Sequence, residues 1–120
     1  STRHFVNAET IAKMKDGVTI INCARGELMN IPDMIRGIET QKIGALALDV
    51  FDKEDGIYHE NRRDDIISNR DMAYLRQFPN VIMTQHMAFY TDAAVQSMVF
   101  CGIEGLCDFA KTGHTETELV

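Results

Sequence analysis

The sequence predicts an α/β domain built on a parallel β-sheet. Three short runs, residues 18–23, 45–50 and 81–84, are rich in apolar residues and alternate with segments of helical spacing. This alternation is typical of strand–helix–strand units, in which successive strands run parallel. The first run is almost wholly apolar, which favours a sheet covered by helices on both faces. We therefore expect the order helix, strand, helix, strand, loop, helix, strand, helix.

Capping residues indicate where the helices begin. Asn7 can accept hydrogen bonds at the start of the first helix, with Lys13 and Lys15 in its last turn, where cations suit the helix dipole, and Gly17 after it. The other predicted starts are Asn30, which is followed by Pro32 and Asp33, a short helix over 71–77, and Thr91 before a long final helix.

The final helix carries an apolar stripe and two internal glycines. The stripe consists of Val95, Met98, Val99, Gly102, Leu106 and Phe109. Gly102 and Gly105 each cost roughly 1 kcal/mol relative to alanine, so we expect another backbone to pack closely against them. Residues 51–69 are polar and acidic without any period, and we interpret them as an ordered surface loop.

Composition excludes several classes of protein. The 120 residues fit one domain, and the net charge of −6 argues against a nucleic-acid partner. No apolar stretch approaches the roughly 20 residues that span a bilayer, and the start of the chain lacks the layout of a signal peptide. The three cysteines, Cys23, Cys101 and Cys107, form no CxxC pair. They predict a reducing, cytoplasmic setting with thiols that act as small buried hydrophobes, and no disulfide framework or zinc site.

Polar residues follow the three predicted strands at one edge of the sheet. In parallel sheets, ligands bind beyond the carboxyl ends of the strands. Arg25 can bind a carboxylate with two hydrogen bonds, and His86 can act as a general acid and base near neutral pH. Glu54 could orient His86, and Asp49 either caps a neighbouring backbone or contacts a ligand. The alternatives are a surface arginine, a structural histidine and a solvated glutamate in a run of charges.

Several short motifs together resemble one enzyme family. They are Thr2-Arg3-His4 with Asn7, Met14-Lys15-Asp16-Gly17, Ile21-Asn22-Cys23-Ala24-Arg25-Gly26, Ala47-Leu48-Asp49-Val50-Phe51 with Glu54, Pro79-Asn80-Val81, and His86 with Ala88-Phe89-Tyr90-Thr91. With these motifs the chain resembles the C-terminal part of a D-isomer-specific 2-hydroxyacid dehydrogenase of the D-lactate and D-2-hydroxyisocaproate branch. The resemblance covers nearly all of the chain.

The resemblance implies a Rossmann-like NAD-binding domain of which the chain is only the C-terminal portion. Residues 1–91 would complete that domain, and residues 92–120 would be a helix and tail that return toward a substrate domain. The implied activity is the reduction of a small 2-oxo acid by NADH. The implied enzyme is cytoplasmic, takes part in fermentation and forms a homo-oligomer, namely a dimer. Isolated from the rest, the chain would be inactive, because its sequence contains no glycine-rich phosphate loop.

The resemblance also implies the roles of individual residues. Arg25 would bind the substrate carboxylate and polarise the ketone, His86 would donate the proton, and Glu54 would hydrogen-bond His86. The implied cofactor contacts are Thr2, Cys23, Ala24, Arg25 and Asp49, the implied substrate pocket contains Phe89 and Tyr90, and no metal is implied.

Two residues depart from the family pattern. Asn30 stands where the family usually has Asp, and Gln85 stands where it often has Pro. The alternative functions are an NADH-binding, corepressor-like interaction module and a catalytically inert fragment. The identity of the 2-oxo acid and the choice between NAD and NADP stay open at this point.

Overall fold

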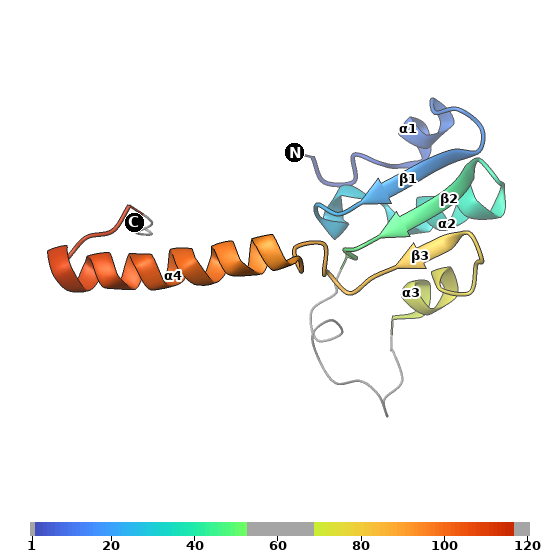
Figure 1. Ribbon diagram of the computed structural model, residues 1–120. Helices are drawn as coiled ribbons and strands as arrows, with labels where there is room; N and C mark the ends of the chain where they lie inside the picture. Colours follow the sequence, from blue (N-terminus) through green and yellow to red (C-terminus); the bar gives the residue numbers. More distant parts are fainter. Residues whose placement is uncertain (1, 53–68, 117–120) are drawn as a thin grey trace. The chain divides into compact units, whose positions relative to one another are not determined.

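The computed structural model describes residues 2–52 and 69–116, which belong to two compact units, Ser1–Met87 and Ala88–Val120. The described elements are α1 (Ala8–Ala12), β1 (Val18–Asn22), the 3-10 helix η1 (Gly26–Leu28), α2 (Ile31–Glu39), β2 (Ile43–Leu48), α3 (Arg70–Leu75), β3 (Val81–Met83) and α4 (Asp92–Thr112). Their order confirms the predicted α/β class (Figure 1). The predicted loop over 51–69 lies almost entirely outside the described residues.

The sheet of the first unit is parallel throughout, with β2 between β1 and β3. Its register aligns the last residues of the strands, since Asn22 pairs with Leu48 and Leu48 pairs with Met83. All three arrows in Figure 1 therefore end at one edge. The segments that follow the strands, which carry Arg25, Asp49 and His86, start at the same level of the sheet.

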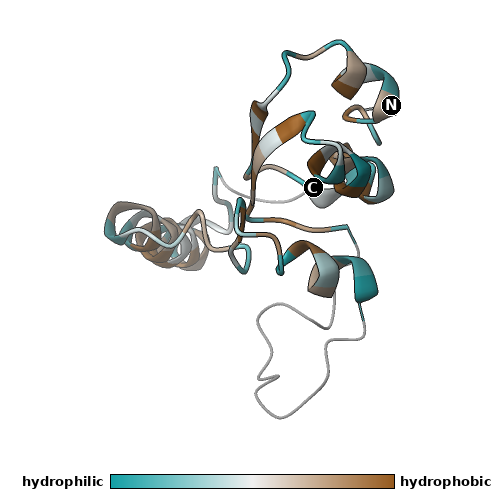
Figure 2. Ribbon diagram, turned by 90° about the vertical axis from the view of Figure 1, so that its right-hand side faces the viewer, coloured by the Kyte–Doolittle hydropathy of each residue, from teal (hydrophilic) through white to brown (hydrophobic). Residues whose placement is uncertain are grey.

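The helices of the first unit cover one face of the sheet, as Figure 2 shows along the strands. The core between the sheet and these helices is formed by Ile11, Met29, Ile31, Met34, Ile38, Ile43, Leu46, Leu48, Phe51, Met72 and Leu75. On the other face, Ile21, Ala47 and Ile82 form a paired row, and Ile21 and Ile82 are 68% and 65% exposed. The described helices of the first unit thus cover one face, and the expectation of helices on both faces is not met within this unit.

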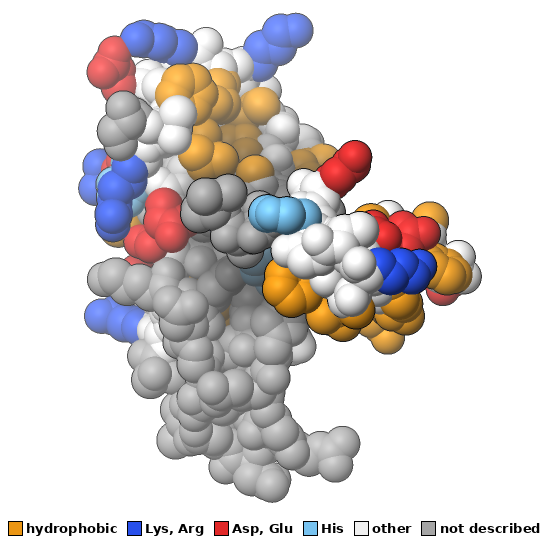
Figure 3. Space-filling view, turned by 90° about the vertical axis from the view of Figure 1, so that its left-hand side faces the viewer, with side chains coloured by type: hydrophobic (Ala, Val, Ile, Leu, Met, Phe, Trp, Pro, Cys, Tyr) orange, Lys and Arg blue, Asp and Glu red, His pale blue; other side chains and the backbone are white. Residues whose placement is uncertain are grey.

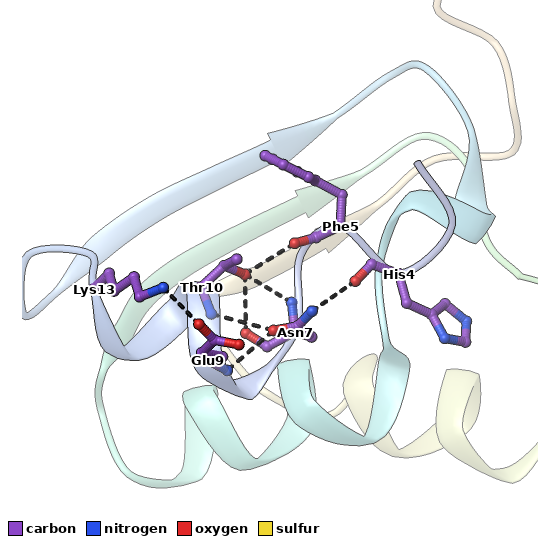
Figure 4. A network of polar contacts seen from close by, with 6 residues as sticks. All are labelled: His4, Phe5, Asn7, Glu9, Thr10 and Lys13. Atoms are coloured by element: carbon purple, nitrogen blue, oxygen red, sulfur yellow. Dashed lines mark hydrogen bonds and ion pairs between the residues drawn. The ribbon is translucent and has the colours of Figure 1, made fainter. Parts of the chain in front are cut away.

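Side-chain caps start the helices as the sequence predicted. The Asn7 carboxamide oxygen accepts from the backbone N–H groups of Glu9 and Thr10, at 3.0 and 3.2 Å, and the Thr10 hydroxyl accepts from Asn7 N–H at 2.9 Å (Figure 4). The helix ends at Ala12, so the placement of Lys13 and Lys15 in its last turn is wrong. The predicted caps Asn30 and Thr91 start α2 and α4. The cap of α3 is Asn69, which the sequence analysis did not name.

The second unit consists mainly of α4, and none of the residues of this helix is buried. The predicted apolar stripe is present but uncovered, and hydrophobic side chains line this helix in Figure 3. A Cβ added at Gly102 would meet nothing within 4 Å, so the expected close backbone is absent among the described residues. By length and composition alone, α4 is long and apolar enough to span a membrane, since it has 21 residues and an 18-residue stretch of it has a mean hydropathy of 1.2. The sequence analysis did not expect such a stretch, and the absence of a membrane partner stays a prediction.

The three cysteines are exposed, which contradicts the expectation that they are small buried hydrophobes. Cys101 and Cys107 lie on the uncovered helix α4, and Cys23 lies in the turn after β1.

Gly26 allows the segments after β1 and β2 to touch through their backbones. A Cβ built at Gly26 would lie 2.2 Å from the carbonyl carbon of Phe51 and 2.4 Å from the backbone nitrogen of Asp52. Real Cβ atoms do not approach backbone atoms this closely, and the neighbour is main chain that cannot rotate away. A glycine is therefore required for this contact.

We predict that Gly26→Ala destabilises the first unit by about 1–3 kcal/mol, because an extra carbon in tight packing forces the backbone apart. Urea unfolding followed by far-UV circular dichroism measures this change. Gly102→Ala is the matched control, since it adds the same methyl group into open space on a helix. It should not lower the unfolding midpoint and should increase helicity. Equal midpoints for both variants would contradict the packing role of Gly26.

Candidate active site

Three of the predicted site residues lie at the carboxyl edge of the sheet. Arg25 follows β1, Asp49 follows β2 directly, and His86 follows β3. Arg25 is exposed, His86 is half-buried, and Asp49 is only 4% exposed. The segments after the strands thus carry a cation, an imidazole and a buried carboxylate. The sequence analysis expected these three residues at this edge, and their roles stay predictions.

The turn that carries Arg25 is held by the side chain of Asn22, the last residue of β1. The carboxamide oxygen of Asn22 accepts from Ala24 N–H at 3.0 Å, and its NH₂ group donates to the Arg25 carbonyl at 2.9 Å. The Arg25 guanidinium Nη1 donates to the Ala24 carbonyl at 2.8 Å. The backbone of Arg25 is extended, and its side chain faces solvent.

The segment that carries His86 is held by Asp49. One carboxylate oxygen of Asp49, Oδ1, accepts from the Thr84 hydroxyl at 2.5 Å and from Met87 N–H at 2.8 Å. The Asp49 carbonyl accepts from His86 N–H at 2.7 Å. A buried carboxylate needs such donors, because an unpaired buried charge is costly.

His86 has a left-handed backbone conformation, with φ of 54°. This region disfavours side chains in general, although histidine enters it more often than bulky residues do. Strained residues of this kind persist when their surroundings determine them, and they concentrate at functional sites. Here the hydrogen bonds from His86 N–H and Met87 N–H to Asp49 fix the residue on both sides.

The predicted cofactor contacts also lie on this side of the first unit. Cys23 and Ala24 are exposed in the turn between β1 and Arg25. Thr2 belongs to an N-terminal segment that is tied to η1, because His4 N–H donates to the Glu27 carbonyl at 2.8 Å. The Thr2 carbonyl accepts from Phe5 N–H at 3.1 Å within the same segment.

Three other predicted residues lie outside the described part of the first unit. Glu54 lies outside the described residues. Phe89 and Tyr90 belong to the second compact unit, where both are exposed and their rings meet edge to face at 6.2 Å. Among residues 2–52 and 69–116, no group of three or more potential metal ligands is present.

Sequence reasoning missed Asn22 and Thr84, which hold the two segments in place. A signal for Asn22 existed, since it is a polar residue at the end of an apolar run, and asparagine commonly bonds to the backbone two residues on. Thr84 gave no comparable signal, because its partner, Asp49, is 35 residues away in the sequence.

The comparison with protein families decides the assignment of the fold. Residues 1–88 match the D-isomer specific 2-hydroxyacid dehydrogenase, NAD binding domain. The chain belongs to this family. NAD is the cofactor that the domain binds, and the family predicted from the sequence is confirmed.

Individual relatives agree with this assignment. The chain is 42% identical over 117 residues to an aromatic 2-oxoacid reductase of Clostridium sporogenes. The matched region covers 98% of this chain and 35% of that relative. A solved structure of a D-lactate dehydrogenase from Sporolactobacillus sp has a TM-score of 0.93 at 30% identity, over 98% of this chain and 36% of that one. An NAD-complexed D-isomer specific 2-hydroxyacid dehydrogenase from Lactobacillus delbrueckii ssp. bulgaricus has a TM-score of 0.87 at 26% identity, over 99% and 36%.

The chain spans about a third of the length of the proteins that it matches. The boundary between the two compact units falls after Met87. The predicted division into residues 1–91 and 92–120 stays a prediction.

We predict that Asp49→Ala lowers the stability of the first unit by about 2–3 kcal/mol, because buried donors lose a charged acceptor. Asp49→Asn is the matched variant, since it keeps an oxygen at the same place for one or both donors, and its loss should be smaller. Denaturant unfolding gives both values, and the amide exchange rates of His86 and Met87 report the segment itself. Unchanged exchange at both amides in Asp49→Ala would contradict the role of the carboxylate.

Proposed function

We propose that the chain is part of an NAD-dependent oxidoreductase that reduces a small 2-oxo acid to the D-2-hydroxy acid. The observation that carries the proposal is the register of the sheet, which brings Arg25, Asp49 and His86 to one edge within a domain of this family. The relatives named above, an aromatic 2-oxoacid reductase and a D-lactate dehydrogenase, support the same class of substrate. The proposal includes a cytoplasmic location and a homodimeric full-length protein.

In this proposal the ketone is reduced by addition of a hydride to carbon 2 and of a proton to its oxygen. Arg25 binds the substrate carboxylate with its planar guanidinium and polarises the ketone. His86 holds the proton and donates it to the oxygen as negative charge develops there. Glu54 is the proposed hydrogen-bond partner of His86. Phe89 and Tyr90 are proposed to shape the pocket for the substrate side chain.

The exposed turn after β1 is the proposed contact for the nicotinamide end of the cofactor. Cys23 and Ala24 are open to solvent, while the turn itself is fixed by the buried Asn22. The proposed contacts are the backbone of Cys23, Ala24 and Arg25, the carboxylate of Asp49 and the segment of Thr2. Bound NADH supplies the hydride, and the residues of this chain orient the acid and deliver the proton.

We predict that His86→Asn in the full-length enzyme lowers kcat by about 10²–10⁴-fold, the range that a general acid contributes. Asparagine tolerates the left-handed backbone of residue 86 but cannot donate a proton of suitable pKa, so the variant separates chemistry from backbone strain. Steady-state kinetics with pyruvate or an aromatic 2-oxo acid measures turnover.

The companion variants, Arg25→Ala and Arg25→Lys, should lower kcat/KM in that order of severity, because lysine keeps the charge but loses the bidentate fork. NADH binding, measured by fluorescence titration, should survive in all three variants. Near-normal turnover of both His86→Asn and Arg25→Ala would overturn the assigned roles.

We predict that the 120-residue chain alone does not oxidise NADH with any 2-oxo acid. Its sequence contains neither GxGxxG nor another phosphate-binding loop, so nothing in it holds the pyrophosphate. The measurement is NADH absorbance at millimolar 2-oxo acid, with a full-length relative as positive control. Turnover by the purified chain would show that the cofactor site has been misplaced.

A further inference from the structure

Asn22 is a buried polar residue to which the proposed reaction assigns no task. Asn22 and Asp49 are the buried polar or charged side chains among the described residues, at 7% and 4% exposure. Asp49 is a proposed cofactor contact and holds the segment of His86. Asn22 lies at the same level of the sheet, beneath the turn that carries Arg25.

Both polar ends of the Asn22 carboxamide are engaged by that turn. The oxygen accepts from Ala24 N–H at 3.0 Å, and the nitrogen donates to the Arg25 carbonyl at 2.9 Å. The two bonds enclose Ala24 and Arg25, because Ala24 N–H belongs to the peptide unit before Ala24 and the Arg25 carbonyl to the peptide unit after Arg25. They therefore set the direction in which the Arg25 Cα–Cβ bond leaves the turn. A carboxylate cannot make both bonds, since it has no donor.

The chain on either side of the turn is fixed, so it cannot move far if the two hydrogen bonds of the Asn22 side chain are lost. Gly26 is packed directly against the backbone of Phe51, which fixes the chain after Arg25. The carbonyl of Asn22 accepts from Asp49 N–H at 2.9 Å, which fixes the chain before it. Between these two anchors, the Asn22 side chain bonds to both ends of the turn. The Arg25 carbonyl also accepts from Leu28 N–H at 3.3 Å, and the Arg25 guanidinium donates to the Ala24 carbonyl at 2.8 Å.

We propose that Asn22 is a positioning residue for Arg25, and that its carboxamide sets the pose in which the guanidinium receives the substrate carboxylate. This inference rests on the proposed function. Because Arg25 binds the carboxylate, misplacement acts mainly on substrate binding. A displacement of about 1 Å costs up to about 10²-fold in rate, so we expect kcat/KM to fall by about 10–100-fold through a higher KM.

The test compares Asn22→Asp, Asn22→Ala and Asn80→Asp in the full-length enzyme. Asn22→Asp keeps the size of the side chain and the acceptor for Ala24 N–H, but places an oxygen against the Arg25 carbonyl. Asn80→Asp is the matched control, because Asn80 donates to the Gly44 carbonyl at 2.8 Å in the turn that precedes β3. Both Asn22 variants should raise the KM for the 2-oxo acid and weaken binding of oxamate to the NADH complex. Asn80→Asp should change neither.

A double-mutant cycle separates positioning from a general structural effect. In an Arg25→Lys background, Asn22→Asp should cost much less than in the wild type, since the bidentate pose has already been lost. The proposal would be overturned if Asn22→Asp kept the wild-type KM and lowered kcat only in proportion to the folded fraction. It would also be overturned if the effects of the Asn22 and Arg25 substitutions on kcat/KM were fully additive. A wild-type enzyme that reduces no 2-oxo acid would instead overturn the proposed function.

Discussion

The geometry of the rim depends on the hydrogen bonds that join the ends of the three parallel strands. Asp49 directly follows the central strand and is bonded to the segments on both sides, through its N–H to the Asn22 carbonyl and through its carbonyl to His86 N–H. Its carboxylate also accepts hydrogen bonds from the Thr84 hydroxyl and from Met87 N–H. Because the register puts Asn22, Leu48 and Met83 in one row, a buried residue just beyond the central strand can reach the segments on both sides. The placement of Arg25 and His86 follows from this one junction.

Unlike the hydrogen-bonded strand ends, much of the apolar surface of the chain has no packing partner among the described residues. The row of Ile21, Ala47 and Ile82 on the sheet and the apolar residues of α4 are exposed. Parallel sheets normally bury both faces, so this exposure is physically unusual for a complete domain. It agrees with a chain that spans about a third of its relatives. The same reasoning accounts for α4, whose composition suits burial against protein as well as a membrane span.

The sequence was sufficient to predict the helices and strands, and the edge of the sheet at which the polar residues lie, because both depend on local patterns. Asn7, Asn30 and Thr91 cap helices as predicted, and the strands run parallel. Burial of α4 and of the cysteines was mispredicted, since an apolar residue carries no information on whether its cover lies in the same chain. The bonds from Thr84 and Met87 to Asp49 could not be predicted, because they join residues more than 30 positions apart. Residue roles came from family resemblance and stay predictions.

The two buried residues at the strand ends differ in chemistry for a reason that the structure supplies. The turn after β1 offers Asn22 one N–H group and one carbonyl, so its partner must both accept and donate. The carboxamide of Asn22 does so with two separate atoms, whereas a carboxylate has no donor. The segment after β3 offers Asp49 a hydroxyl and an N–H group, both donors, for which a carboxylate is the stronger partner. Exchange of the two residues would leave a carboxylate against a carbonyl on one side and a weaker acceptor on the other. The polarity of each strand end is therefore set by the backbone groups of the segment that it holds.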